Sequence, residues 1–167
     1  MLMCHSREGG NDSWVSLVDL RQNKNKNEVF CFFKFFIMNK HLAIFSHNLG
    51  DLVLSGEKTV DLRFAKKKIA PYLKVMKGDR VYVQNVGRNA AGQVEVENVL
   101  FFDSLNSGKL RQIKKDYLKL AAIDTRLFNR FADGNSYLSV IFLKNPQKYV
   151  APVKFHHRDR RGWQVLS

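Results

Sequence analysis

The pattern that most constrains the fold is a series of short apolar segments after Met38, several of which alternate with period two between turn residues. The series lacks the regular strand–helix alternation of a doubly wound sheet. We therefore expect an α+β fold, namely a small β-barrel or curled mixed sheet of about six strands with one early helix and two later helices. The expected strands are residues 41–45, 59–64, 80–86, 94–99, 137–143 and 160–166.

Capping residues indicate where the helices begin and end. Asn48 could cap the early helix at residues 48–54, and Ser55-Gly56 is expected to stop it. Residues 105–131 carry the helical periodicity of the two later helices, and Asp124 is expected to cap the second of them.

Turn residues divide the strands in the same way. Residues 80–86 and 94–99 are close enough in sequence to form a hairpin. The continuous apolar run at residues 137–143 is typical of a central strand. Asn145-Pro146 is expected to break that strand, because proline cannot donate a backbone hydrogen bond.

Charge and composition divide the chain near Met38. Residues 1–38 carry five Lys or Arg and four Asp or Glu, a net charge of +1. Residues 39–167 carry 23 Lys or Arg and 11 Asp or Glu, so they hold +12 of the net charge of +13. We expect residues 1–38 to be a poorly structured extension of a domain at residues 39–167. One hypothesis is that translation begins at Met38 and that the upstream stretch is a gene-model artefact, because residues 5–12 (HSREGGND) resemble translated intergenic repeats of bacterial genomes. The alternative is a genuine extension whose Phe-rich patch touches a membrane or a partner.

The charge favours a polyanionic partner, since a sequence pI near 9.9 is typical of nucleic-acid-binding proteins. A merely basic surface is the alternative. No apolar run approaches the roughly 20 residues that span a bilayer, so we expect no membrane partner and a cytoplasmic location. Both cysteines lie within the first 31 residues, which excludes a disulfide scaffold and a Cys-based zinc site in the remainder. We expect neither a metal nor a cofactor.

The strongest local feature is the run GEKTVDLR at residues 56–63. Gly56 ends the predicted helix, and Asp61 and Arg63 point to one side of the strand that follows, because strand side chains alternate. Lys58 lies at the entrance of this strand and could turn toward them. Such a cluster can hold an anion, or it can lower the pKa of the lysine and make it a base. The alternative is a solvated sheet face with a surface ion pair, which contributes little to stability.

This run resembles the pattern G-x-K-x-x-E-x-R of the ASCH domain, a branch of the PUA-like superfamily, with Asp61 in place of Glu. The similarity covers roughly residues 39–167, through the Gly78-Asp79 turn and the strand at 137–143 to the closing DRRGW at 159–163. It implies a PUA-like β-barrel, a cleft lined by the signature residues, and RNA or a modified nucleoside or nucleotide as the ligand. Gly56 and Arg63 of the signature are expected to contact that ligand.

The resemblance also implies an enzymatic alternative. Some small ASCH-domain proteins are amidohydrolases that remove the acetyl group of N4-acetylcytidine, and one group has been described as ribonucleases. Lys58 matches their signature lysine, and Glu95 would supply the matching glutamate of an acid–base pair. The amidohydrolases have a nucleophilic threonine where this chain has Asp61, which could instead keep Lys58 protonated or orient a water molecule. The simpler interpretation of Glu95 is a surface carboxylate, because the valines on either side of it face inward.

Further basic and aromatic residues are expected at the cleft. Three lysines directly after the signature strand could grip phosphates at its mouth, or they could form a solvated loop. Cations beside aromatic rings are typical of proteins that bind single-stranded nucleic acid, although a tryptophan serves equally well in a core. The candidates are Lys66, Lys67, Lys68, Tyr72, Arg160, Arg161 and Trp163.

Overall fold

The computed structural model describes residues 3–8, 11–16, 38–156 and 161–166. The chain divides into two compact units, Met1–Ile37 and Met38–Ser167. The first unit contains an antiparallel hairpin of β1 (Met3–Glu8) and β2 (Asn11–Ser16), which the sequence did not predict. Residues 29–37 of the Phe-rich patch lie outside the described residues.

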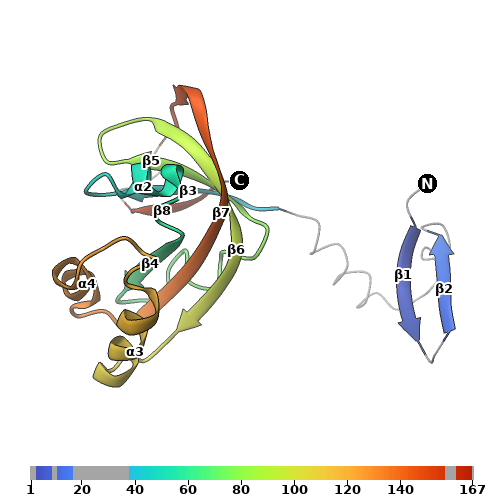
Figure 1. The fold of residues 1–167 in the computed structure, drawn as a ribbon, viewed down its shortest axis with the longest axis horizontal. Coiled ribbons are helices and arrows are strands. Elements are labelled where there is room, and N and C mark those ends of the chain that lie inside the picture. Colours follow the sequence, from blue (N-terminus) through green and yellow to red (C-terminus); the bar gives the residue numbers. More distant parts are fainter. Residues whose placement is uncertain (1–2, 9–10, 17–37, 157–160, 167) are drawn as a thin grey trace. The chain divides into compact units, whose positions relative to one another are not determined.

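The second unit is built on one curled, mixed sheet of six strands (Figure 1). Its strands follow the order β4-β7-β6-β5-β3-β8. Neighbouring strands are antiparallel except β3 and β5, which run parallel. The strand bounds are β3 (Lys40–Phe45), β4 (Val60–Ala65), β5 (Arg80–Asn85), β6 (Ala90–Phe102), β7 (Tyr137–Val153) and β8 (Trp163–Leu166).

Three helices accompany this sheet: α2 (Leu49–Ser55), α3 (Ser107–Tyr117) and α4 (Thr125–Ala132). The α+β prediction of about six strands with one early and two later helices is thereby confirmed. None of the helices in the described part of the chain is both long enough and apolar enough to cross a membrane.

Helix ends follow the predictions in part. Gly56 ends α2 in the left-handed conformation, with φ 84°, which glycine adopts without strain. Asp124 caps α4 by accepting a hydrogen bond from the backbone N–H of Leu127 at 2.7 Å. Asn48 precedes α2 as predicted, but its side chain makes no capping hydrogen bond; its own backbone is left-handed, with φ 57°.

The prediction that Asn145-Pro146 breaks the strand is wrong, because β7 continues to Val153. The break is avoided because β4 pairs with β7 only at residues 137–142, so the missing N–H of Pro146 faces no β4 partner. The irregularity is absorbed by Asn145, which has a positive φ of 52°, and by register shifts between β6 and β7. The predicted hairpin of β5 and β6 and the central position of residues 137–142 between β4 and β6 are confirmed.

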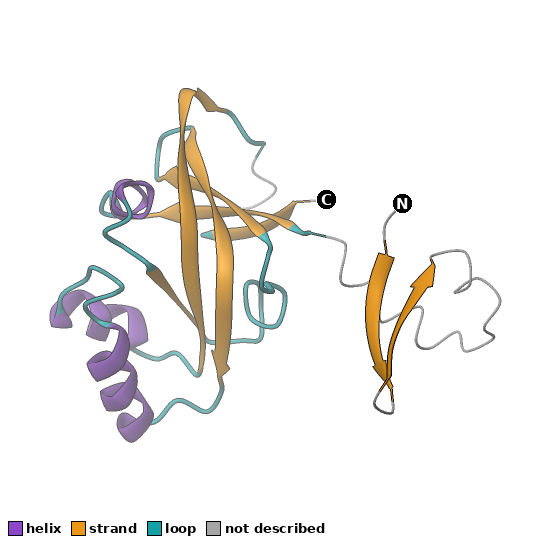
Figure 2. Cartoon of the chain, turned by 45° about the vertical axis from the view of Figure 1, so that its right-hand side comes forward, coloured by secondary structure: helices purple, strands orange, loops and turns teal. Residues whose placement is uncertain are grey.

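Two hydrophobic clusters lie on opposite faces of the curled sheet. One lies inside the curl, where α2 packs against β3, β5, β6 and β7; it includes Val53, Val83 and Trp163. The other lies where α3 and α4 pack against β4 and β7, and includes Val60 and Leu62 (Figure 2). The alternation of β4 therefore directs its apolar residues toward the helices and its Asp61 and Arg63 toward the inside of the curl.

Candidate functional site

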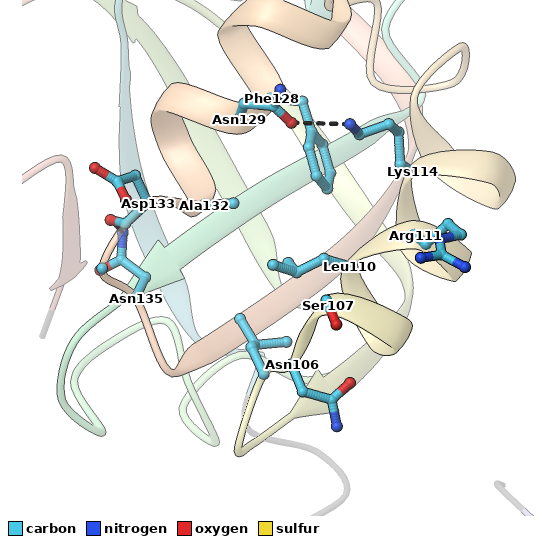
Figure 3. A pocket seen from close by; sticks show the side chains of 12 residues that line it. Asn106, Ser107, Leu110, Arg111, Lys114, Phe128, Asn129, Ala132, Asp133 and Asn135 are labelled. Carbon is cyan, nitrogen blue, oxygen red and sulfur yellow. Dashed lines mark hydrogen bonds between the residues drawn. The ribbon is translucent and has the colours of Figure 1, made fainter.

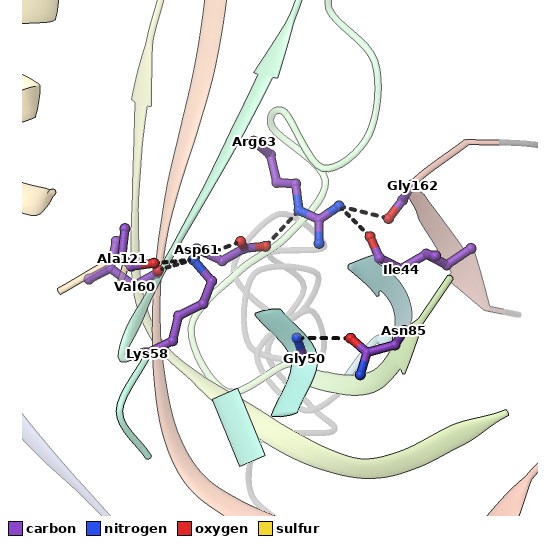
Figure 4. A network of polar contacts seen from close by, with 9 residues as sticks. All are labelled: Ile44, Gly50, Lys58, Val60, Asp61, Arg63, Asn85, Ala121 and Gly162. Atoms are coloured by element: carbon purple, nitrogen blue, oxygen red, sulfur yellow. Dashed lines mark hydrogen bonds and ion pairs between the residues drawn. The ribbon is translucent and has the colours of Figure 1, made fainter. Parts of the chain in front are cut away.

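The signature residues form a chain of buried polar contacts (Figure 4). Lys58 is only 2% exposed, and its Nζ donates to the backbone oxygens of Val60 at 2.8 Å and Ala121 at 2.9 Å. The same Nζ lies 3.4 Å from Oδ1 of Asp61. Three partners account for the three hydrogens of the ammonium group, so this lysine joins the start of β4 to the segment between α3 and α4.

Arg63 links the two edges of the sheet. Its Nε donates to Oδ2 of Asp61 at 2.6 Å. Its Nη1 donates to the backbone oxygen of Ile44 on β3 at 3.1 Å and to that of Gly162, just before β8, at 2.9 Å. Since β4 and β8 are the two edge strands, the guanidinium group spans the gap at which the curled sheet would otherwise be open.

Burial and charge act in opposition on this cluster. Burial lowers the pKa of the Lys58 ammonium group, although the Asp61 carboxylate opposes that effect. Burial raises the pKa of Asp61, but the charges of Arg63 and Lys58 outweigh it and hold that pKa below its ordinary value. The alternative of a solvated surface ion pair is wrong, because Asp61 is only 4% exposed and Lys58 is equally inaccessible.

A small cavity of about 150 Å³ lies beside this cluster, between β4, β7 and the start of β8. Arg63 and Trp163 form part of its wall, together with Tyr72, Tyr137 and Ser139. The ring centroids of Tyr72 and Tyr137 lie 5.2 Å apart at 65°. The guanidinium carbon of Arg63 lies 5.3 Å from the centroid of Trp163, so this part of the wall combines aromatic rings with a cation held against one of them.

Two polar atoms of the cavity-lining residues are buried and have no hydrogen-bond partner among the described residues: Nη2 of Arg63 and Oγ of Ser139. Such atoms are rare in folded proteins and call for an explanation. Ser139 was not among the predicted site residues, although the sequence contains a signal for it. After Tyr137, Ser139 is the one polar residue in the apolar run of residues 137–143. Because a central strand is buried, a polar residue within it is expected to be buried too, and Ser139 is.

A histidine that sequence reasoning also missed positions the tryptophan of this wall. His41 is fully buried, its Nδ1 accepts from the indole N–H of Trp163 at 3.3 Å, and its Nε2 lies 2.9 Å from Oδ2 of Asp79. Asp79 also accepts from the backbone N–H groups of Asn39 and Met76, at 2.9 and 2.8 Å. Trp163 is therefore fixed by a buried polar chain as well as by packing.

Of the other predicted cations, Lys68 and Arg161 lie at or near the cavity. Lys66, Lys67 and Lys68 are exposed on the loop after β4, and the Nζ of Lys68 lies 5.6 Å from the centroid of the cavity-lining Tyr137. Arg161 lines the cavity, whereas Arg160 lies outside the described residues. Gly56 serves as the end of α2.

Glu95 and Lys58 have different partners. Glu95 lies 3.0 Å from Nζ of Lys144 and accepts from the side-chain amide of Asn145 at 3.1 Å. The hydrogen bond from Lys144 is the main reason that the pKa of this carboxyl lies below its ordinary value. Its side chain is 39% exposed, in line with a surface carboxylate.

A larger hollow of about 590 Å³ lies between α3 and α4 (Figure 3). Phe128 and Leu110 supply apolar lining, and Lys114 donates to the side chain of Asn129 at 2.8 Å across it. Of the predicted site residues that the structure describes, none lines this hollow. Within the described residues, no group of three or more His, Cys, Asp or Glu side chains could hold a metal ion.

The fold is that of ASCH proteins of known structure, as the resemblance implied. The crystal structure of ASCH from Zymomonas mobilis matches with a TM-score of 0.61 and 13% sequence identity, over 77% of this chain and 87% of that chain. A serine-to-alanine variant of that protein matches with a TM-score of 0.62 and 13% identity, over 77% of this chain and 88% of the other. No family model and no curated protein matches the sequence. At this level of identity, the similarity shows the fold alone.

Proposed function

We propose that this chain binds RNA or a modified nucleoside in the cytoplasm, with one base held in the cavity between β4, β7 and β8. The observation that carries the proposal is the pair of buried, unpartnered polar atoms on Arg63 and Ser139 beside an aromatic wall. A planar base can stack on such a wall, and its carbonyl or ring nitrogen can pair with those atoms.

The size and charge of the cavity agree with this ligand. A volume of about 150 Å³ equals roughly five water molecules in the liquid, which suits one heterocycle and not a base pair. The positive charges of Arg161 in the wall and of the nearby Lys68 support the proposal, because they could bind a phosphate attached to the base. The signature residues Lys58 and Asp61 support this wall from behind: Asp61 orients Arg63, and Lys58 orients Asp61.

The hydrolase and ribonuclease alternative requires an acid–base pair of Lys58 and Glu95. Lys58 already has three partners, and Glu95 is engaged with Lys144 and Asn145. The contacts therefore favour binding over this catalytic pair. Release of acetate from N4-acetylcytidine by the protein, abolished by Lys58→Ala, would favour the enzyme instead.

The proposal is tested by calorimetric titration with cytidine and uridine 5′-monophosphates and with N4-acetylcytidine. Ser139→Ala should weaken binding about tenfold, the effect of losing one hydrogen bond in a buried site. It should not lower the free energy of unfolding, because its hydroxyl has no protein partner to lose. Ser136→Ala, at an exposed position next to β7, is the matched control. Equal affinities of Ser139→Ala and wild type, or no binding at millimolar ligand, would contradict the proposal.

A further inference from the structure

The outer face of the sheet carries three half-buried aromatic rings on or beside β5 and β7, the two strands that flank β6. Tyr82 lies on β5, Tyr149 lies on β7, and Phe155 follows β7. The rings of Tyr82 and Phe155 are in contact, with centroids 4.8 Å apart and planes tilted by 45°. Tyr82 is paired with Gln93 of β6, whose Oε1 accepts from the hydroxyl of Tyr149 at 2.9 Å. We call Arg80, Tyr82, Gln93, Tyr149 and Phe155 the outer aromatic patch.

This patch is separate from the cavity. Val81 and Val83, on either side of Tyr82, belong to the cluster inside the curl that includes Trp163, so the ring of Tyr82 points to the opposite face. The helices α3 and α4 pack against Leu138 and Val140, near the other end of β7 from Tyr149. Figure 1 shows β7 continuing well past these helices.

Positive charge accompanies the rings. Arg80 is paired in register with Glu95 on β6 and with Lys40 on β3. Glu95 lies 3.0 Å from Nζ of Lys144 and also feels the charge of Arg80, so Lys40, Arg80 and Lys144 together outnumber this carboxylate beside the patch. Burial, and after it the neighbouring Tyr82, raise the pKa of the Tyr149 hydroxyl, so this ring stays neutral at physiological pH.

We propose that the outer aromatic patch binds single-stranded nucleic acid, with bases stacked on its rings and phosphates beside Lys40 and Arg80. Stacking platforms of this kind combine aromatic faces with a cationic track, and they tolerate any sequence because every base has a π-face. The amide groups of Gln93 and Gln147, joined at 2.6 Å, offer hydrogen bonds to base edges between the rings. The inference goes beyond the proposed function, since it uses the opposite face of the sheet.

The test is the binding of a fluorescein-labelled, single-stranded 12-nucleotide RNA to the full chain, followed by anisotropy in the presence of 1 mM uridine 5′-monophosphate. Tyr149→Leu should weaken binding about five- to a hundredfold, the range for losing one base–aromatic stack. Tyr149→Phe should bind within about threefold of wild type, because it keeps the ring. Tyr117→Leu, which removes a comparable half-buried tyrosine from α3, should have no effect.

Two further experiments test the phosphate contacts and the preference for single-stranded over duplex RNA. Arg80→Gln should reduce the slope of log affinity against log salt by about 0.7 for one lost phosphate contact, whereas Arg111→Gln on α3 should not. Duplex RNA should bind at least about tenfold more weakly than the single strand, since its bases are not free to stack on protein. Photo-crosslinking of an oligomer that carries 4-thiouridine should label peptides containing Tyr82 or Tyr149 in the wild-type chain, which removes any dependence on the folding of a variant.

Equal affinities of Tyr149→Leu and wild type for the single strand would overturn the proposal, and so would equal binding of duplex and single strand. The two proposals fail separately. If, without the monophosphate, Ser139→Ala weakens oligomer binding while Tyr149→Leu does not, the cavity is the binding site and the patch is not. If nucleotides fail to bind but the oligomer binds and responds to Tyr149→Leu, the patch stands without the cavity.

Discussion

Asp61 connects the two cations of the signature strand, and among the described residues it is the carboxylate that both Lys58 and Arg63 contact. Without it, two positive charges would remain buried next to each other. Removing one partner of a buried pair costs far more than the pair itself contributes, because the remaining charge has lost its compensation. The role of this residue is therefore primarily to make the cluster compatible with burial.

Replacing Asp61 by Asn should lower the free energy of unfolding by about 3–5 kcal/mol, as measured by urea denaturation near pH 7. Asp51→Asn is the control, since the Asp51 carboxylate forms an exposed pair with Arg88 at 3.7 Å and should contribute less than about 1 kcal/mol. Similar losses for the two variants would show that the buried cluster is not a stabilising unit.

The same residue predicts how stability depends on pH. The pKa of Asp61 is lower in the folded chain than the ordinary value of about 3.9. Its contribution is thus fully present above about pH 4 and is lost as the pH falls through the lower, folded pKa. The wild-type free energy of unfolding should fall over this acid range, and the fall should be shallower in Asp61→Asn. Parallel acid profiles of the two proteins would contradict this assignment.

Among elements, β4 and β8 depend on each other through one side chain. The guanidinium group of Arg63 on β4 reaches the backbone oxygens of Ile44 and Gly162, and Gly162 leads directly into the four-residue strand β8. A short edge strand paired only with β3 has few hydrogen bonds of its own. Its order therefore relies on this link and on the packing of Trp163.

Arg63→Lys should weaken this link, because an ammonium group cannot reproduce the planar fork that serves a carboxylate and two carbonyls together. We expect a loss of about 2 kcal/mol and faster amide hydrogen exchange in residues 163–166 than in β5. Arg88→Lys, which changes an exposed ion pair, is the control. Its amide hydrogen exchange in residues 163–166, measured by mass spectrometry, should match that of wild type. Unchanged protection of β8 in Arg63→Lys would mean that packing alone holds the strand.

The elements also show what the sequence could predict. The alternation of residues 59–64 correctly predicted a strand with Asp61 and Arg63 on one side, because period two follows from strand geometry. It could not predict that this side is buried, since the covering groups come from Ile44, Ala121 and Gly162, all distant in sequence. The continuation of β7 past Pro146 depends likewise on which strand lies next to it.

In the candidate site, too, the sequence indicated some residues and could not indicate others whose partners are distant in sequence. The cavity is lined by Arg63, Tyr72, Arg161 and Trp163, and their part in binding a ligand stays a prediction. Ser139 was missed because its importance lies in the absence of a partner, and His41 because its partners, Asp79 and Trp163, are 38 and 122 residues away. The alternation of its neighbours predicts that Glu95 lies on a strand, but it cannot predict which cation the Glu95 carboxylate contacts.

For the whole molecule, the described residues that form the two hydrophobic clusters and the cavity all lie between Ala43 and Trp163. This is also where nearly all the net positive charge lies, so both proposed nucleic-acid surfaces belong to the unit Met38–Ser167. We therefore expect a chain that begins at Met38 to unfold within about 2 °C of the full chain, because no cluster residue is removed and 1 kcal/mol shifts the midpoint of a domain this size by about 4 °C. Its affinity for nucleoside monophosphates should also be unchanged. A calorimetric midpoint lowered by more than about 5 °C, or a tenfold weaker affinity, would show that residues 1–37 form part of the functional fold.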